Sequence, residues 1–343
     1  MSGALLRVDD LRVDFLTDAG RARVLDHVNF EMAAGEIVGL VGESGSGKTT
    51  LARAILGILP ANAAVIESGS IHFEGQNLLE RDPDELARDV RGRLITFVPQ
   101  DPFTSFNPVF TIGSQMMEIM KWKSPLAEPG QDGFWRTHTR KRRQQDRERL
   151  IALLQSVQLP DPEAVLAKYP HEVSGGQRQR LMIAMALSTD ARLIIADEPT
   201  TALDVTIQAQ ILKLLRRLAT ERGVSVLFAT HDLGAAHEIC DRVVVMYAGQ
   251  DVESAPSAAF FKAPAHPYTN SLLASLPSRE HGIRGIPGEI PVLVEPPPGC
   301  RFHPRCARAS DECRGARPLA REVESGHSVR CFHPLMAGSG VES

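Results

Sequence analysis

The chain has 343 residues, of which 43% are hydrophobic and 23% charged, as is ordinary for globular proteins with a sizeable core. Its 42 acidic and 38 basic residues give a net charge of −4, so composition provides no general attraction to nucleic acid. Apolar runs such as residues 243–248 are far shorter than the ~20 residues that span a bilayer. We therefore expect any membrane-spanning part to lie in other chains.

The most informative motif is a glycine-rich turn between an apolar strand at residues 37–41 and a helix at residues 49–56. The amides of such a loop close around phosphates, and the helix N-terminus adds a positive dipole. Lys48 would reach the β- and γ-phosphates, and the Thr49 hydroxyl would hold Mg²⁺. The alternative is a glycine-rich turn without a ligand. The candidate phosphate-binding residues are Gly42, Glu43, Ser44, Gly45, Ser46, Gly47, Lys48, Thr49 and Thr50.

A second motif with exposed amides opens another helix. Residues 173–177 read Val-Ser-Gly-Gly-Gln, and apolar residues recur at helical spacing over residues 178–188. A serine hydroxyl and N–H groups at a helix start form an anion site. One nucleotide does not need two such sites in one chain, whereas two chains facing each other head to tail do. We therefore expect the second site to meet a nucleotide held by another subunit; its residues are Ser174, Gly175, Gly176 and Gln177.

An acidic pair follows the apolar run at residues 193–196, which predicts a buried parallel strand. Asp197 at the strand end suits Mg²⁺ bound through water, and Glu198 suits the base that orients an attacking water. A solvated loop is the alternative for such a pair.

Helices and strands alternate in the second half of the chain. Apolar residues recur on one face of residues 205–222, and Gly223 is suited to end that helix. Residues 224–230 predict another strand, which is followed by His231. A lone histidine at a strand end is more often structural than catalytic. The alternation predicts a parallel α/β core with ligands at the carboxyl ends of its strands.

Together, these motifs resemble the ATP-binding subunits of ABC transporters. Val173 stands where the family's signature motif usually has Leu, a change that leaves the amide donors in place. The resemblance implies an α/β fold: a P-loop NTPase core of ABC ATPase type, an N-terminal β subdomain and a helical subdomain at about 101–176. It also implies ATP and Mg²⁺ as cofactors, and ATP hydrolysis in a head-to-tail pair of ATPase subunits.

The same resemblance implies roles for single residues. Gln100 matches the Q-loop glutamine, which senses Mg²⁺ and the membrane partner, and His231 matches the switch histidine, which contacts the γ-phosphate. Asp204 closes a stretch similar to the D-loop. Phe15 matches the aromatic residue that stacks on adenine, usually Tyr or Trp; the alternative is a core residue of a strand. The implied Mg²⁺ ligands are Thr49, Gln100 and Asp197, and the implied catalytic residues are Lys48, Glu198 and His231.

After about Lys262 the sequence becomes rich in proline. The run from His266 to Thr269 resembles the start of the C-terminal extension in ATPases of oligopeptide, dipeptide and nickel importers. We therefore expect an ABC ATPase domain at residues 1–262 and an importer-type extension at residues 263–343, here called the C-terminal extension. The implied location is the cytoplasmic face of the inner membrane.

The resemblance also implies partner proteins. They are a second ATPase subunit, two transmembrane permease subunits and an extracytoplasmic solute-binding protein. A heteromeric ATPase pair is favoured over a homodimer, and no nucleic acid partner is expected.

The competing function is a soluble ABC-type ATPase that acts on nucleic acid or ribosomes. DNA-acting relatives carry a very long coiled coil between the phosphate loop and the signature, and this chain has no room for one. Ribosome-acting relatives usually carry two ATPase cassettes in one chain, and this chain has one. We therefore favour uptake of peptides or related small solutes. Nickel chelates and opines stay open, because the cassette does not touch the solute.

Four of the five cysteines lie in the C-terminal extension: Cys300, Cys306, Cys313 and Cys331. Disulfides are disfavoured on the cytoplasmic side, and the short C-x₂₋₄-C spacing of most zinc sites is absent. Four thiolates in an irregular segment can instead hold an iron–sulfur cluster, and the resemblance points to a [4Fe–4S] cluster. Zinc and unligated thiols are the alternatives. We expect the extension to affect stability or subunit docking rather than phosphate chemistry.

A basic segment and the fifth cysteine have structural rather than catalytic explanations. Residues 136–149 are dense in basic side chains, which predicts a solvated helix face, with contact to anionic lipid as the alternative. Cys240 precedes a strand and is expected to be an inert thiol of the core.

Overall fold

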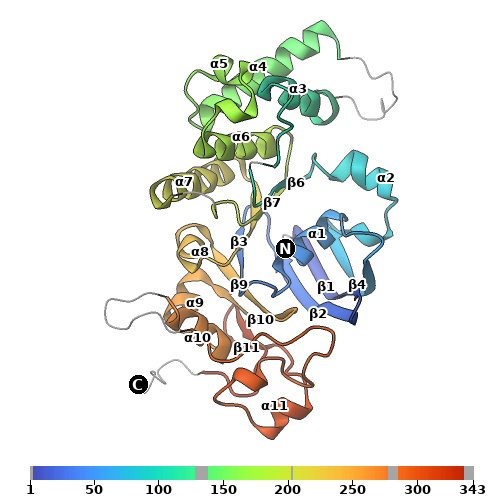
Figure 1. The fold of residues 1–343 in the computed structure, drawn as a ribbon, viewed down its shortest axis with the longest axis vertical. Coiled ribbons are helices and arrows are strands. Elements are labelled where there is room, and N and C mark those ends of the chain that lie inside the picture. Colours follow the sequence, from blue (N-terminus) through green and yellow to red (C-terminus); the bar gives the residue numbers. More distant parts are fainter. Residues whose placement is uncertain (1–2, 103, 128–137, 202–203, 277–284, 336–343) are drawn as a thin grey trace. The chain divides into compact units, whose positions relative to one another are not determined.

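The structure is a computed structural model that describes residues 3–102, 104–127, 138–201, 204–276 and 285–335. The chain divides into two compact units (Figure 1). The first unit comprises residues 1–81 and 228–343, and the second comprises residues 82–227. Strand β8 (Ser225–Thr230) begins in the second unit and ends in the first.

An antiparallel sheet forms the N-terminal part of the first unit, with strand order β2-β1-β4-β5. Leu6 and Val8 of the first strand are buried, as are Leu11 and Val13, and a register shift between Val8 and Leu11 interrupts the alternation expected of a sheet with one covered face. This sheet corresponds to the N-terminal β subdomain that the resemblance implied. Its strands are β1 (Leu6–Thr17), β2 (Gly20–Met32), β4 (Ala64–Phe73) and β5 (Gln76–Asn77).

A second group of strands in the first unit carries the phosphate loop. β3 is buried along its whole length and pairs in parallel with β9, as expected for a strand covered on both faces. β9 pairs antiparallel with β10, β10 with β12, and β12 with β11. Cys240 is buried just before β9, as predicted. The strands are β3 (Ile37–Val41), β9 (Arg242–Tyr247), β10 (Gln250–Pro256), β11 (Arg321–Glu324) and β12 (His327–Val329).

Short helices complete the first unit. They are α1 (Lys48–Leu56), α8 (Leu233–Ile239), α9 (Ser257–Lys262), α10 (Pro267–Ala274) and α11 (Asp311–Gly315), with 3₁₀ turns η1 (Leu78–Glu80) and η4 (His303–Arg305). The C-terminal extension is therefore more regular than its prolines suggested. Strand β12, for example, has only three residues, too few for an alternating pattern to be visible in the sequence.

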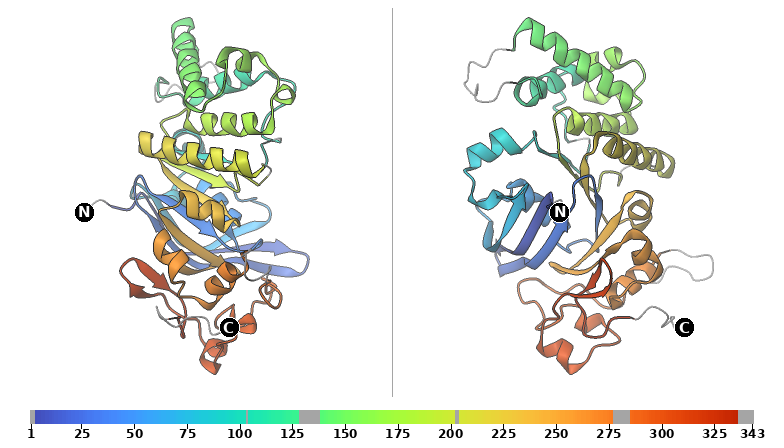
Figure 2. Two further views of the ribbon diagram at one scale, coloured as in Figure 1. Left: turned by 90° about the vertical axis from the view of Figure 1, so that its left-hand side faces the viewer. Right: turned by 180° about the vertical axis from the view of Figure 1, so that it is seen from behind.

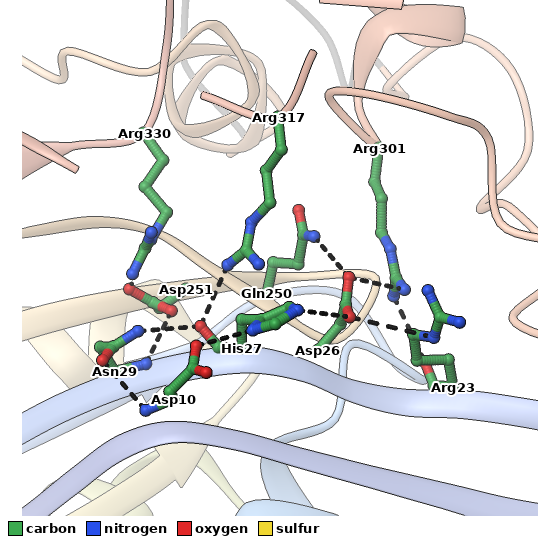
Figure 3. A network of polar contacts seen from close by, with 10 residues as sticks. All are labelled: Asp10, Arg23, Asp26, His27, Asn29, Gln250, Asp251, Arg301, Arg317 and Arg330. Atoms are coloured by element: carbon green, nitrogen blue, oxygen red, sulfur yellow. Dashed lines mark hydrogen bonds and ion pairs between the residues drawn. The ribbon is translucent and has the colours of Figure 1, made fainter. Parts of the chain in front are cut away.

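Arginines of the extension pack against the strands of its own unit (Figure 3). Arg330 pairs with Asp251 at 2.9 Å, and Arg301 pairs with Asp26 at 3.0 Å. Burial alone would raise the pKa of Asp26, but Arg301 and a hydrogen bond from Gln250 outweigh it and lower that pKa. The extension is therefore held to the ATPase strands by buried ion pairs.

The second unit contains a parallel pair of strands together with a group of helices (Figure 2). β6 and β7 pair in parallel, with Ile95 opposite Leu193. α7 ends at Gly223, whose φ of 65° is the left-handed conformation that the sequence predicted for this position. The elements are α2 (Pro83–Glu85), a π-helical turn η2 (Leu86–Val90), β6 (Ile95–Val98), α3 (Ile112–Lys123), α4 (Arg140–Ser156), α5 (Pro162–Ala167), η3 (Pro170–Glu172), α6 (Gly175–Leu187), β7 (Leu193–Asp197) and α7 (Val205–Arg222).

The basic segment falls largely on α4, apart from Arg136, which lies outside the described residues. Most of its basic side chains are exposed, whereas Arg142 pairs with the buried Asp146. This agrees with a solvated helix face. Among the described residues, the helices are too short or too polar for any of them to cross a membrane.

A buried carboxylate fastens the start of the C-terminal extension. Glu253 on β10 accepts hydrogen bonds from the Ala265 N–H at 2.7 Å, the His266 N–H at 2.8 Å and His327 Nε2 at 2.7 Å. Burial by itself would raise the pKa of Glu253, but these hydrogen bonds outweigh it and hold the pKa below its ordinary value. The ionised carboxylate therefore joins β10, the chain before α10, and β12.

Replacing Glu253 with Gln should destabilise the protein by about 2–3 kcal/mol near neutral pH, because the amide cannot accept all three hydrogen bonds. A lowered folded pKa stabilises the fold above the ordinary pKa of Glu and loses that contribution as the pH falls through the folded value. The difference in unfolding free energy between wild type and variant should therefore narrow below about pH 4. Urea unfolding across pH would measure it, with the exposed Glu324→Gln as control. A pH-independent gap would contradict this role.

Candidate functional site

The phosphate loop lies between β3 and α1, as the sequence predicted. Gly47 takes a φ of 104° as it enters α1, and Gly42 takes a φ of 151° as it leaves β3. A Cβ atom at Gly42 would collide with the carbonyl oxygen of Met246 on β9. Glycine is therefore required where the loop passes against the neighbouring strand.

Lys48 is buried, and its ammonium turns into the loop. Its Nζ donates to the Gly42 carbonyl at 2.8 Å, to the Glu43 carbonyl at 3.1 Å and to Ser46 Oγ at 3.4 Å. Thr49 and Thr50 follow, half-buried, in the first turn of α1. The loop thus gathers one cation and the N-terminal amides of a helix, the groups that bind phosphate.

The end of the β1–β2 hairpin lies against this loop. The carbonyl oxygen of Val24 is within 3.1 Å of a Cβ built at Gly47. Phe15 pairs with Ala22 in the same hairpin and is partly exposed. A partly exposed aromatic ring on this hairpin suits adenine stacking, which stays a prediction for Phe15.

His231 is the remaining candidate in the first unit. It is exposed and lies between the end of β8 and α8. The next residue, Asp232, caps α8 by accepting a hydrogen bond from the Ala235 N–H at 3.1 Å. The cap fixes the chain direction just after His231.

The signature residues open α6 in the second unit. Ser174 Oγ accepts from the Gln177 N–H at 3.3 Å, and Gln177 Oε1 accepts from the Ser174 N–H at 3.0 Å. This reciprocal capping box holds the helix start. Gly175 and Gly176 occupy the first helical turn and are partly exposed, and amides at this position have no partner within the helix itself.

The acidic pair terminates β7, also in the second unit. Asp197 is buried, while Glu198 is partly exposed and has a φ of 47°. Gln100 Nε2 donates to Glu198 Oε2 at 2.8 Å, and Thr201 Oγ1 donates to the same oxygen at 3.1 Å. Two donors thus orient the carboxylate proposed as the base. The sequence analysis assigned Gln100 to the Mg²⁺ site and predicted neither its contact nor that of Thr201 with Glu198.

Asp204 has a structural task in this unit. Its side chain accepts from the Ile207 N–H at 3.0 Å and so caps α7. The intervening D-loop residues 202–203 lie outside the described residues. The second unit therefore holds Gln100 with Glu198 and also the signature, while the first holds the phosphate loop, Phe15 and His231.

The structure gathers the four cysteines of the extension. Cys300, Cys306, Cys313 and Cys331 line one small cavity together with His266. Burial, with the neighbouring thiols adding to it, raises the pKa of Cys300 and of Cys331 to about 11. Among the described residues, no group of three or more His, Cys, Asp or Glu side chains is arranged to hold a metal ion.

His266 has a buried nitrogen without a hydrogen-bond partner. Its Nδ1 accepts from the Tyr268 N–H at 3.0 Å, which in the neutral ring assigns the proton to Nε2. Burial lowers the pKa of His266 to about 4, so the ring is neutral at physiological pH. Nε2 is buried and unpaired in a residue that lines the cysteine cavity. This orphaned donor and four gathered thiols fit a site for a thiolate-bound group.

Comparisons with known proteins agree with these observations. Residues 25–201 match the ABC transporter family, and residues 252–313 match the C-terminal region of oligopeptide/dipeptide transporters. A probable peptide ABC transporter ATP-binding protein of Sinorhizobium fredii is 45% identical, over 96% of this chain and 94% of that protein. The dipeptide transport ATP-binding protein DppD of Escherichia coli is 40% identical, over 97% of each chain.

The fold has solved counterparts as well. The dimeric structure of MJ0796, a bacterial ABC transporter cassette, superimposes with a TM-score of 0.60 at 26% identity, over 74% of this chain and 98% of that one. The fold and the motifs define an ATP-hydrolysing ABC cassette. The chain belongs to the ABC transporter ATP-binding proteins, and within them to the oligopeptide/dipeptide branch.

Replacing Gly42 with Ala should abolish measurable ATP binding, because the new methyl group meets the Met246 carbonyl and must displace the loop. Gly45→Ala is the matched control. Gly45 also has a positive φ, of 80°, but a Cβ there meets no atom within 4 Å, so only the backbone strain of about 1–2 kcal/mol applies. Titration with ATP would compare the two variants. Equal losses of ATP affinity in the two variants would contradict the steric explanation.

Proposed function

We propose that this ATPase subunit drives the uptake of peptides or related small solutes through separate membrane subunits. One observation carries the proposal: a complete set of ABC motifs is joined to an oligopeptide-type extension, and relatives of the same length are named for peptide transport. We propose the ATPase domain at residues 1–262, with the helical subdomain at about 101–176, and the extension at residues 263–343. The net charge of −4 gives no support to the nucleic acid alternative.

We assign the chemical roles as follows. The phosphate-loop amides and Lys48 bind the phosphates, while Phe15 stacks on adenine. The signature residues and Asp204 of this chain would complete the nucleotide site of a second ATPase subunit, and the corresponding motifs of that subunit would complete the site here. Thr49, Gln100 and Asp197 would hold Mg²⁺, which neutralises phosphate charge when bound. Glu198 orients and deprotonates the attacking water, and His231 contacts the γ-phosphate.

The helical unit offers a surface for a membrane partner. A groove of about 440 Å³ lies on the second unit and is lined mainly by apolar side chains, among them Phe97, Ile119, Trp122, Met182 and Met185. Aromatic and methionine side chains adapt well to a bound helix. We propose that this groove receives a helix of a permease subunit.

We further propose the remaining partners and the location. They are a second ATPase subunit, with a heteromer favoured over a homodimer, and a solute-binding protein outside the cell. The complex places this chain at the cytoplasmic face of the inner membrane.

We also propose a [4Fe–4S] cluster at the four cysteines rather than zinc. Zinc draws four thiolates to within about 3.8 Å of one another, given Zn–S bonds of about 2.3 Å in a tetrahedron. A cluster spaces its cysteines more widely, because iron and sulfide lie between them. Four thiols that line one cavity, in a segment without the short C-x₂₋₄-C spacing of most zinc sites, suit the larger group. The cluster would supply a covalent cross-link, and the unpaired His266 Nε2 could donate to one of its sulfurs.

Replacing Glu198 with Gln should preserve ATP binding and lower hydrolysis by at least about a hundredfold, because an amide cannot accept the proton of the attacking water. Phosphate release and ATP titration would measure both properties. Glu163→Gln, an exchange at an exposed position on α5, provides the control and should behave like wild type. Wild-type rates in Glu198→Gln would overturn the assignment of the base.

Protein purified without oxygen should be brown and should contain iron and sulfide, and Cys306→Ser should lose most of both. Cys240→Ser is the matched control, because Cys240 is a buried thiol outside the cavity and its loss should leave the iron content unchanged. Stoichiometric zinc without iron would establish the zinc alternative. Metal-free protein would refute both.

A further inference from the structure

The C-terminal extension touches the phosphate loop at Glu43. Arg305 forms a two-pronged ion pair with the Glu43 carboxylate, through Nη1 at 2.9 Å and Nη2 at 3.2 Å. The backbone N–H of Glu43 donates to the hydroxyl of Tyr268 on α10 at 3.0 Å. Two residues more than 200 positions away in the chain therefore hold both the side chain and the backbone of one loop residue.

Arg305 is itself fixed. Its side chain is only 3% exposed. Nε donates to the Pro287 carbonyl at 2.8 Å, Nη2 donates to the Ile286 carbonyl at 3.2 Å, and Nη1 also reaches the Tyr247 hydroxyl at 3.4 Å. The planar guanidinium thus uses its whole fork of donors, an arrangement that the single ammonium of Lys cannot reproduce.

Tyr268 is equally well placed. Its ring packs against Tyr247 of β9 at a centroid distance of 4.5 Å and against Phe302 at 5.4 Å. The side chain is fully buried, so the hydroxyl has a fixed position relative to the loop. The same aromatic group joins β9, which flanks the loop, to the segment between Cys300 and Cys306.

These contacts converge on one peptide bond. The N–H of Glu43 and the C=O of Gly42 belong to the same rigid peptide plane. On one side the N–H is held by Tyr268, and on the other the C=O accepts from Lys48 Nζ at 2.8 Å. Fixing this plane fixes the position to which the Lys48 ammonium is drawn.

A second connection reaches the other end of the loop. Arg301 donates to the carbonyl of Ala248, and the next residue, Gly249, donates its N–H to the Ser46 carbonyl at 2.9 Å. Arg301 and Arg305 both lie in the segment bounded by Cys300 and Cys306. One short piece of the extension therefore supports the loop at Glu43 directly and at Ser46 through the Ala248–Gly249 peptide.

We propose that Arg305 and Tyr268 are positioning residues for ATP binding: they orient the Gly42–Glu43 peptide and, through it, Lys48. The extension thus acts on phosphate chemistry as well as on stability, which revises the expectation drawn from its sequence. The inference rests on the phosphate loop being the ATP site. It does not depend on which solute is transported.

The test compares ATP affinity in four single variants of the full chain and one double variant. Arg305→Lys should raise the ATP Kd about tenfold, since the two-pronged contact is lost, and Tyr268→Phe should raise it about threefold, since only the hydroxyl is removed. Arg330→Lys is the matched control: it weakens an ion pair of the same extension, to Asp251, and the described structure shows no contact between the Arg330 side chain and the loop. Its Kd should stay within about twofold of wild type even where thermal stability falls.

Glu43→Gln tests whether Arg305 affects ATP binding through its contact with Glu43 or only through the stability of the fold. If Arg305 acts through Glu43, the double variant Arg305→Lys/Glu43→Gln should bind ATP about as well as the weaker single variant, rather than showing the product of both losses. At saturating ATP, the hydrolysis rate of Arg305→Lys should fall much less than its affinity. Unchanged ATP affinity in both Arg305→Lys and Tyr268→Phe, or losses matched by Arg330→Lys, would overturn the proposal. Failure of the wild type to bind ATP would instead refute the assigned function.

Discussion

The close approach of the phosphate loop to β9 is the constraint on which the rest of the site depends. Amides can surround a phosphate only if the backbone turns sharply as it leaves a buried strand, and Gly42 achieves that turn directly against the Met246 carbonyl. The position of β9 therefore limits the loop from one side. Residues that hold β9 in place therefore also hold the loop in place. In this chain they include Tyr268, which packs on Tyr247 of β9, although the loop itself lies in the first fifty residues.

The extension is held in place by buried polar residues as well as by apolar ones. Glu253 binds the backbone before α10, while Arg301 and Arg330 pair with acids on the strands (Figure 3). Breaking one partner of a buried pair is costly, because the other charge is left without compensation. Such pairs specify a unique docking geometry more sharply than apolar contacts do. A fixed docking geometry keeps the amides of the phosphate loop in the positions that surround a phosphate.

Sequence patterns predicted the parts of the fold that depend on local signals. The phosphate loop, the strand before Asp197, the helix ending at Gly223 and the burial of Cys240 all agree with the structure, because each has a local signature of glycine placement or periodicity. The site motifs were recognised for the same reason. The contacts of Tyr268 and Arg305 with Glu43 were not predicted, since no local pattern relates residues 225 and 262 positions apart. Thr201 was missed beside Glu198 because a threonine in a turn has no distinguishing spacing.

The pairing of β12 with β10 has a consequence for anyone who handles this protein. Glu253 lies opposite Val329, so a strand from the last part of the chain covers the backbone of β10, which pairs on its other side with β9. A recombinant cassette trimmed after residue 262 would bare that row of amides and carbonyls. Uncovered strands of this kind template intermolecular pairing. The natural boundary for expression is therefore the far end of the extension, although the catalytic motifs end well before it.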